Sequence, residues 1–242
     1  MRLKKIIKMF EDGNVCVCGL RGRGKDMLMG NVIIRRKKPY MSNTNYGGEY
    51  YPLDMSALQV AGNTYENFLS GKVNYYEWGS PEGCDIYISD LGVYFPSQYC
   101  SELNKKYGQV AVFQALSRQI GGVNFHGNAQ ALGRIWDKIR EQSDQYILCR
   151  YCWVLFGKIV IQRGTIYDNY ESAQHRRKPL LLPSGKLFDK EYNLQREVAK
   201  ANFEAQHGTI RNFWLIYINK STYNTRIFKE ILQNGKQEQK NR

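Results

Sequence analysis

The sequence lacks the features that mark secreted and membrane-spanning proteins. Its N-terminus has no charged segment followed by an apolar core of the kind that signal peptides carry. The most apolar long stretch, residues 146–161, contains Arg150 and Lys158 and is shorter than the roughly 20 apolar residues that span a bilayer. We therefore expect neither a secretory leader nor a transmembrane segment.

The cysteines lack the regular spacing of a disulfide framework. Six of them are scattered along 242 residues, which is typical of free thiols in a reducing cytoplasm. Cys149 and Cys152 have C-x-x-C spacing, but no second pair or nearby histidine completes a zinc site, so a structural role is favoured. Cys16 and Cys18 are expected to be small core residues.

Acidic residues are scarce relative to basic ones. The chain has 35 Lys and Arg against 22 Asp and Glu, a formal net charge of +13 and a pI near 9.4. Such a charge favours an anionic partner, either nucleic acid or an acidic membrane surface, and charge alone does not choose between them. With 43% hydrophobic residues, the chain can bury a core of ordinary size.

Short apolar runs alternate with helical patterns over the first two thirds of the chain. Such alternation predicts an α/β fold, in which helices flank a mostly parallel central sheet. A loop is expected from residue 43 to about residue 83, with a short helix within it near residues 64–70. We expect strands at residues 14–18, 39–42, 86–90 and 122–128, and helices at residues 24–36, 109–120 and 131–142.

A β-hairpin and a basic segment complete the predicted organisation. Two β-rich runs, residues 145–156 and 158–167, meet at Gly157 and predict an antiparallel hairpin. We divide the chain into a domain at residues 1–168 and a basic C-terminal extension at residues 169–242, which is peripheral or packs on the same domain. The extension is predicted to contain a polar helix at residues 191–207, a strand at residues 212–218 and a helix at residues 225–233.

A glycine-rich loop follows the first predicted strand. Its sequence, Gly19-Leu20-Arg21-Gly22-Arg23-Gly24-Lys25, has Walker A spacing and opens a helix. In such a loop, backbone N–H groups surround phosphate oxygens while the lysine reaches the outer phosphates. This pattern predicts a P-loop NTPase fold that binds ATP. The predicted nucleotide-binding residues are Leu20, Arg21, Gly22, Arg23, Gly24, Lys25, Asp26 and Met27.

Two acids are candidates for binding Mg²⁺. Asp26 stands where a Ser or Thr usually supplies a hydroxyl, and its carboxylate also brings negative charge close to the phosphates. Asp90 ends an apolar run, at the Walker B position, and its alternative role is to cap the next turn. Leu91 replaces the acid that commonly follows, so a second acid would have to be Asp85 or Glu102. ATP binding is therefore a firmer prediction than hydrolysis.

Further candidates for catalysis lie downstream. Gln130 follows a predicted strand, where a polar side chain can sense the γ-phosphate, although a glutamine at a helix start is the simpler reading. Arg118, Arg134 and Arg140 are candidates for arginines that act across a subunit interface, or are solvated helix residues. Of these candidates, Gln130 and Arg140 join Lys25 and Asp90 as the predicted catalytic residues.

The ordered motifs together resemble the zonula-occludens-toxin-like family of phage assembly ATPases, within the FtsK/HerA group. The resemblance rests on the glycine-rich loop, Ile88-Ser89-Asp90-Leu91-Gly92-Val93-Tyr94-Phe95-Pro96-Ser97, Ala115-Leu116-Ser117-Arg118-Gln119, Asn128-Ala129-Gln130 and Asp137-Lys138-Ile139-Arg140. It covers roughly residues 14–168. The family commonly has a glutamate where Leu91 stands and His-Arg-His where residues 117–119 lie.

The resemblance implies a role in moving viral DNA with ATP and Mg²⁺. It assigns Gln130 as the sensor residue and places Arg140 near a subunit interface of a homo-oligomer. Filamentous-phage members usually carry a transmembrane segment after the ATPase domain, and none is expected here. The alternatives are a soluble motor, closer in use to a genome-packaging ATPase, and a motor that relies on a separate membrane or capsid protein partner. The expected location is the host cytoplasm, with peripheral attachment to the inner membrane or association with the virion as alternatives.

Three functions are therefore compared. The first is an oligomeric ATPase that couples hydrolysis to viral DNA packaging or extrusion. The second is a nucleotide-binding assembly or scaffold protein that has lost hydrolysis, since Asp26 and Leu91 both depart from the catalytic pattern. The third is a basic DNA-binding protein that contacts phosphates through residues 35–38 and 175–178.

Overall fold

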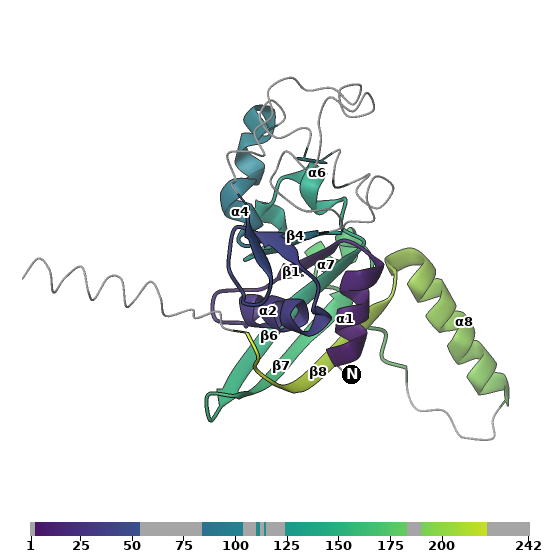
Figure 1. Cartoon of the computed structure of the whole chain (residues 1–242). Helices are drawn as coiled ribbons and strands as arrows, with labels where there is room; N and C mark the ends of the chain where they lie inside the picture. The colour runs from purple at the N-terminus through teal and green to yellow at the C-terminus, as the bar shows by residue number, and fades with distance from the viewer. Residues whose placement is uncertain are drawn as a thin grey trace, which may run out of the picture.

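A single eight-stranded sheet organises the chain (Figure 1). A computed structural model describes residues 3–53, 84–103, 110–111, 114, 124–182 and 190–221. Across the sheet, the strands follow the order β3-β2-β4-β5-β1-β6-β7-β8. Their bounds are β1 (Val15–Cys18), β2 (Tyr40–Ser42), β3 (Tyr50–Pro52), β4 (Asp85–Ile88), β5 (Phe125–Ala129), β6 (Gln145–Leu155), β7 (Ile159–Tyr167) and β8 (Ile210–Ile218).

The sheet has a parallel part and an antiparallel part. Strands β3, β2, β4, β5, β1 and β6 pair with one another in parallel, whereas β6 with β7 and β7 with β8 pair antiparallel. Parallel neighbours need crossover connections, whereas β6 and β7 are joined by a tight turn at Gly157. The predicted α/β fold and its hairpin are confirmed. Strand β8 extends this same sheet as its last strand.

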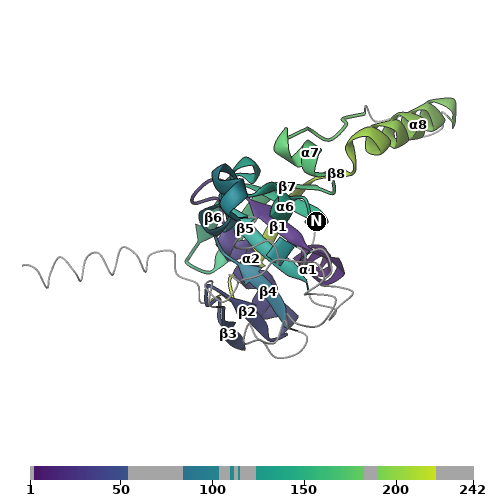
Figure 2. The same cartoon turned by 90° about the horizontal axis from the view of Figure 1, so that it is seen from above.

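Helices cover both faces of the sheet. Helices α1 (Leu3–Asp12) and α2 (Lys25–Arg36) pack on one face, through a cluster that includes Phe10 and Leu28. Helices α4 (Leu91–Tyr94), α6 (Asp137–Arg140) and α7 (Tyr170–Gln174) contribute to the cluster on the other face. Helix α8 (Lys190–His207) projects away from the sheet in both views (Figures 1 and 2). Within the described residues, no helix is long and apolar enough to cross a bilayer.

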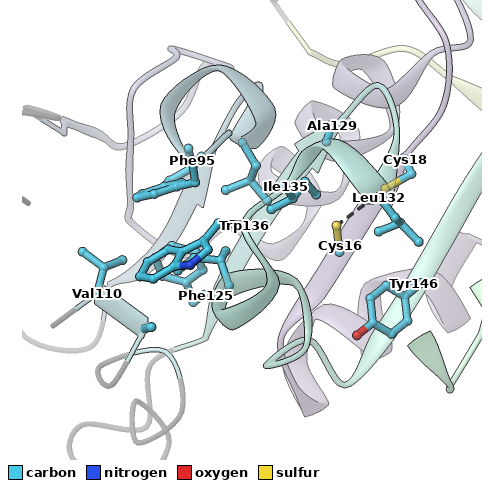
Figure 3. Close-up of a cluster of buried hydrophobic side chains, with 14 of the residues drawn as sticks. Cys16, Cys18, Phe95, Val110, Phe125, Ala129, Leu132, Ile135, Trp136 and Tyr146 are labelled. Carbon is cyan, nitrogen blue, oxygen red and sulfur yellow. Dashed lines mark hydrogen bonds between the residues drawn. The ribbon is translucent and has the colours of Figure 1, made fainter. Parts of the chain in front are cut away.

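The strands of the parallel part are buried on both faces. In β1, Val15 and Val17 point into the α1/α2 cluster, whereas Cys16 and Cys18 point into the opposite cluster (Figure 3). A strand buried on both faces reads as a continuous apolar run, as Val15–Cys18 does. The expectation that Cys16 and Cys18 are core residues is confirmed.

One predicted helix is wrong. Residues 131–142 form a 3₁₀ turn, η3 (Leu132–Arg134), and the short helix α6, with Trp136 between them. Trp136 is fully buried, and its backbone N–H donates to the Phe95 carbonyl at 2.7 Å (Figure 3). Burial of this large side chain outweighs the local helical pattern. Pro96 forms an isolated β-bridge with Ile135, which is incompatible with a continuous helix.

Other differences concern elements that the sequence pattern did not reveal. Helix α1 was not expected, although Ile6 and Phe10 lie four residues apart and are both buried. Strand β3 falls in a segment expected to be a loop. The predicted helices at residues 64–70 and 225–233 lie outside the described residues. Of residues 109–120, only 110–111 and 114 are described, and these are helical.

Candidate phosphate-binding site

The glycine-rich loop joins the end of β1 to the start of α2. Gly19 N–H donates to the Ala129 carbonyl at 3.1 Å, which ties the loop to β5. Gly22 and Gly24 have φ values of 78° and 77°, a left-handed conformation that favours glycine. Gly24 is the N-cap of α2, so the first N–H groups of the helix face the space above the loop. Backbone donors at a helix N-terminus form a ready site for an anion.

The two cysteines of the C-x-x-C sequence line the floor of this loop. A Cβ atom on Gly24 would lie 2.6 Å from Cys152 Sγ, and one on Gly19 would lie 2.6 Å from the Cys149 carbonyl oxygen. No other side chain fits at either position without movement. The packing of Cys149 and Cys152 therefore explains why positions 19 and 24 of the loop are glycine.

Lys25 lies at the centre of the site. It is buried, with 5% of its surface exposed, and forms no ion pair with a carboxylate of the described residues. Burial raises the pKa of Asp90, the charge of Asp26 raises it further, and the charge of Lys25 opposes both. Lys25 is adjacent to Asp26 in the chain, and Asn128 bridges Asp26 to the Asp90 backbone, so the three residues lie close together. A buried lysine beside a loop of N–H groups matches the requirements of phosphate oxygens.

Asp26 is held by a cluster of neutral hydrogen-bond donors. Its Oδ1 accepts from Asn128 Nδ2 at 2.7 Å, from Ser89 Oγ at 3.1 Å and from the Tyr46 hydroxyl at 3.3 Å. Ser89 follows β4 and Asn128 lies near the end of β5, so neighbouring parallel strands deliver these donors to one edge of the sheet. Three donors from separate segments of the chain therefore converge on one carboxylate oxygen.

Asn128 also fixes the backbone at the second acid. Its Oδ1 accepts from Asp90 N–H at 3.0 Å, while Asn43 and Ser89 exchange two hydrogen bonds of 2.8 and 3.0 Å. Asp90 itself has a φ of 56°, a left-handed conformation that aspartate tolerates better than most residues. Asn43, Ser89 and Asn128 were not predicted to serve this purpose. Their shared position at the carboxyl ends of parallel strands is the signal that could have found them.

The two acids fit a hard divalent cation. Mg²⁺ is commonly bound in nucleotide sites through one or two carboxylates plus phosphate oxygens, with water in the remaining positions. Asp26 and Asp90 could supply such carboxylates, because Asn128 donates to Asp26 Oδ1 and accepts from the Asp90 N–H. In the described part of the chain, no three His, Cys, Asp or Glu residues form a metal cluster. A Mg²⁺–nucleotide complex brings phosphate and water ligands of its own.

Two buried residues of the antiparallel part, Gln162 and Tyr217, support the glycine-rich loop. Gln162 Nε2 in β7 donates to the Gly24 carbonyl at 3.1 Å and contacts Cys149 Sγ at 3.2 Å. Tyr217 in β8 donates its hydroxyl to Gln162 Oε1 at 2.8 Å, which fixes the orientation of the amide. Strand β8 therefore takes part in shaping the phosphate loop, although it lies at the far edge of the sheet.

The other loop residues are less enclosed. Leu20 and Arg21 are exposed, while Met27 is half-buried and packs against the α1/α2 cluster. The half-buried Arg23 places its guanidinium 5.1 Å from the centre of the Tyr151 ring. Of the predicted nucleotide-binding set, the loop amides and Lys25 are thus best placed to contact phosphates.

Gln130 and Arg140 lie in different surroundings. Gln130 is exposed and directly follows Ala129, whose carbonyl accepts from Gly19. Arg140 stacks 4.7 Å from the centre of the Tyr170 ring and pairs with Glu141 at 3.7 Å. These contacts direct Arg140 toward α7, and its role at a subunit interface stays a prediction.

The remaining candidate acids and arginines lie in varied surroundings, as far as the structure describes them. Asp85 begins β4, at the opposite end of that strand from Asp90, and is buried in an ion pair with Arg36. Glu102 and Arg134 are exposed, and Arg118 lies outside the described residues. Leu91 is buried against Gly127, where a Cβ would lie 2.3 Å from Leu91 Cδ1. The residue after Asp90 is therefore a core residue.

Comparisons with known proteins give similarity at the level of structure. No family model matches the sequence, and no curated protein matches it. Similar solved structures include the N-terminal domain of zonular occludens toxin from Neisseria meningitidis, at 10% identity and a TM-score of 0.43, covering 90% of this chain and 97% of that chain. The motifs of the sequence resemble the family of that protein.

Two further neighbours are a viral DNA-packaging ATPase and a cytoplasmic domain by name. The DNA-packaging ATPase B204 from Sulfolobus turreted icosahedral virus has 15% identity and a TM-score of 0.38, covering 72% of this chain and 98% of that chain. The cytoplasmic domain of EssC has 14% identity and a TM-score of 0.40, covering 96% of this chain and 44% of that chain. At such low identities and TM-scores, what this chain binds has to be judged from its own residues.

Proposed function

We propose that this chain is an ATP-binding motor of phage morphogenesis, which couples ATP hydrolysis to viral DNA packaging or extrusion. The observation that carries the nucleotide part is the loop of left-handed glycines between β1 and α2, with the buried Lys25 at its end. Such a loop offers N–H donors and one cation to a chain of phosphates, which few other ligands require.

Each residue of the site has a role in this proposal. The amides of residues 20–27 bind phosphate oxygens, and Lys25 neutralises the outer phosphates. Asp26 and Asp90 hold Mg²⁺, which supplies positive charge against the phosphate oxygens when it is bound. Gln130 is assigned to the γ-phosphate, because it follows the strand whose last residue anchors Gly19.

The DNA part of the proposal rests on charge and on the resemblance of the motifs. A net charge of +13 favours a polyanion, and its effect on DNA affinity should fall steeply with salt. We assign Arg140 to the interface of a homo-oligomer, and propose viral DNA together with a membrane or capsid protein as partners. The proposed setting is the host cytoplasm.

A second candidate is a nucleotide-binding assembly or scaffold protein without hydrolysis. The observation in its favour is Leu91, whose burial in the core excludes a water-polarising carboxylate from that position. Asp26 adds to this case, because a negative charge close to the phosphates weakens ATP binding unless Mg²⁺ neutralises it.

Phosphate release distinguishes these candidates. We expect the full chain with Mg²⁺ and ATP to release inorganic phosphate, faster when DNA is added, and Lys25→Ala to abolish the release. Lys200→Ala, on the exposed surface of α8, is the matched control that should leave it unchanged. Saturable ATP binding without phosphate release would contradict the motor and favour the scaffold. DNA affinity that does not depend on nucleotide would favour the third function, a basic DNA-binding protein.

A further inference from the structure

One face of the antiparallel part is apolar and exposed. Its opposite face packs on α1 and α2 through Val160, Phe213 and Leu215, all buried. On the exposed face, the register aligns three cross-strand rows: Tyr151, Arg163 and Trp214; then Trp153, Ile161 and Ile216; then Leu155, Ile159 and Ile218. We call these nine residues, together with Phe156 in the turn, the hairpin face.

Residue types change in order along the hairpin face. The row nearest the phosphate loop contains an arginine, the middle row is mixed, and the row nearest the turn is entirely aliphatic. Large parts of these side chains are exposed, including 46% of Trp153 and 73% of Ile216. At a rise of about 3.3 Å per residue, the first and third rows are about 13 Å apart. The face therefore runs from cationic to aromatic to aliphatic toward its tip.

Cations and aromatic rings form a stack at the end of this face nearest the phosphate loop. Tyr151 and Trp153 stack at 5.6 Å, and Trp153 and Trp214 at 6.1 Å, with their planes within 8° of each other. Arg23 lies over Tyr151 at 5.1 Å and Arg163 over Trp214 at 5.2 Å. No Asp or Glu occurs in β6, β7, β8 or the turn between β6 and β7. The exposed surface is thus apolar or positively charged throughout.

Packing within the chain does not explain why a phenylalanine stands at position 156, in the turn of the hairpin. Its side chain is 92% exposed, and its φ of 51° is unfavourable for a bulky residue. Gly157 follows with a φ of 67°, and Lys158 N–H donates to the Leu155 carbonyl at 3.1 Å, which closes a two-residue turn. Such turns strongly favour Asn-Gly. A phenylalanine held in this conformation, without packing, points to a contact outside the chain.

We propose that the hairpin face is a membrane-docking surface, which inserts Phe156 and the aliphatic row into an anionic lipid bilayer. In this arrangement the aromatic rings lie at the headgroup level, where Trp and Tyr are favoured, and Arg23 and Arg163 meet lipid phosphates. The order of residue types selects this occupant. A nucleic acid gains little from the aliphatic row, and an apolar protein interface does not require Arg23 and Arg163 beside the aromatic rings. Lys158, exposed in the turn, adds a further cation for anionic lipid headgroups.

The proposal does not depend on nucleotide binding. It is tested by flotation of the full chain with vesicles of phosphatidylcholine containing phosphatidylglycerol, and with vesicles of phosphatidylcholine alone. We expect binding to the anionic vesicles that weakens with salt, and much less binding to the neutral ones. Fluorescence of Trp153 and Trp214 should shift to the blue on binding, because both rings leave water.

Phe156→Asn separates docking from folding. Since it creates the favoured Asn-Gly turn, its thermal midpoint should be unchanged or higher, whereas its vesicle partition coefficient should fall about tenfold or more. Leu194→Asn, at a residue 63% exposed on α8, is the matched control and should bind as the wild type does. Lys25→Ala should also bind vesicles normally, so failure of the nucleotide proposal would not affect this result.

Three outcomes would overturn the docking proposal. The wild-type chain could fail to float with anionic vesicles, or Phe156→Asn could float as well as the wild type. The third is a chain that does not bind vesicles but whose molar mass or DNA affinity falls on Phe156→Asn. That result would assign the hairpin face to a second copy or to nucleic acid.

Discussion

The parallel and antiparallel parts of the sheet differ in what surrounds them. Strands β1, β4 and β5 are buried on both faces, and their carboxyl ends deliver Cys18, Ser89 and Asn128 to the phosphate loop. Beyond Cys149, the antiparallel part has one buried face and one exposed apolar face. The closed part of the sheet therefore positions the site, while the open part leaves an apolar surface exposed.

The two parts are not independent. Gln162 reaches from β7 to the Gly24 carbonyl, and Arg23 reaches from the phosphate loop to Tyr151 on the hairpin face. Contacts from both sides of the antiparallel part therefore converge on consecutive loop residues. A structural change at the hairpin face can therefore reach the loop through these contacts.

The largest expected effect contrasts matched aromatic residues in the two parts. Phe125 in β5 is 1% exposed, so Phe125→Ala should lower the free energy of unfolding by about 3–5 kcal/mol through lost burial and a cavity. Trp153→Ala, on the exposed face, should lower it by less than about 1.5 kcal/mol. Urea unfolding of both variants measures the difference, and equal losses would contradict the division into a closed and an open part.

The next effect concerns the glycines of the loop. Gly24→Ala should destabilise the chain by about 2 kcal/mol or more and weaken Mg²⁺–ATP binding, because it adds a contact with Cys152 to the strain of a left-handed residue. Gly22→Ala has a similar φ but nothing within 4 Å of the added Cβ, so it should show the strain alone. Thermal unfolding and ATP titration compare the pair. A larger loss at Gly22 would be inconsistent with the packing described.

A pH effect is expected in the parallel part. Burial holds the pKa of His126 in β5 well below its ordinary 6.5, and the charges of Arg36 and Lys38 lower it further. A depressed histidine pKa means that the unfolded chain binds the proton more tightly, so stability is full above pH 6.5 and falls as pH drops. The slope reaches at most about 1.4 kcal/mol per pH unit for one group. Urea unfolding from pH 7.5 to 5 should show this loss, and His126→Gln should flatten it.

The smallest effect tests the link between the two parts. Tyr217→Phe removes the hydroxyl that orients Gln162, and should cost about 0.5–1.5 kcal/mol of stability. Because Gln162 holds the Gly24 carbonyl, ATP affinity should also fall. Tyr151→Phe is the control, since it keeps the ring under Arg23 and removes only an exposed hydroxyl. Unchanged ATP affinity in Tyr217→Phe would show that β8 does not support the loop.

The sequence predicts much of the fold because its signals are local. The apolar run of β1, the glycine spacing of the loop, the helical pattern of α2 and the hairpin around Gly157 each depend on neighbouring residues. The predicted helix at residues 131–142 is wrong for the opposite reason. Trp136 is buried and bonded to Phe95, a residue far away in the sequence. Helix α1 has a clear amphipathic pattern that could have been found.

The site is predictable only where a motif marks it. Lys25, Asp26 and Asp90 stand at recognisable positions, and the structure brings them together. The donors to Asp26 come from Tyr46, Ser89 and Asn128, which the sheet order assembles from separate segments of the chain. Gln162 and Tyr217 support the loop from strands that no phosphate-binding motif includes.

Calorimetric titration of Mg²⁺–ATP into the full chain tests the central claim most directly, because that claim is that the loop holds nucleotide phosphates. The account predicts saturable binding to the wild type, loss of that binding in Lys25→Ala, and wild-type binding in Lys200→Ala. Absence of binding to a folded wild-type chain, or equal affinity in Lys25→Ala, would contradict it.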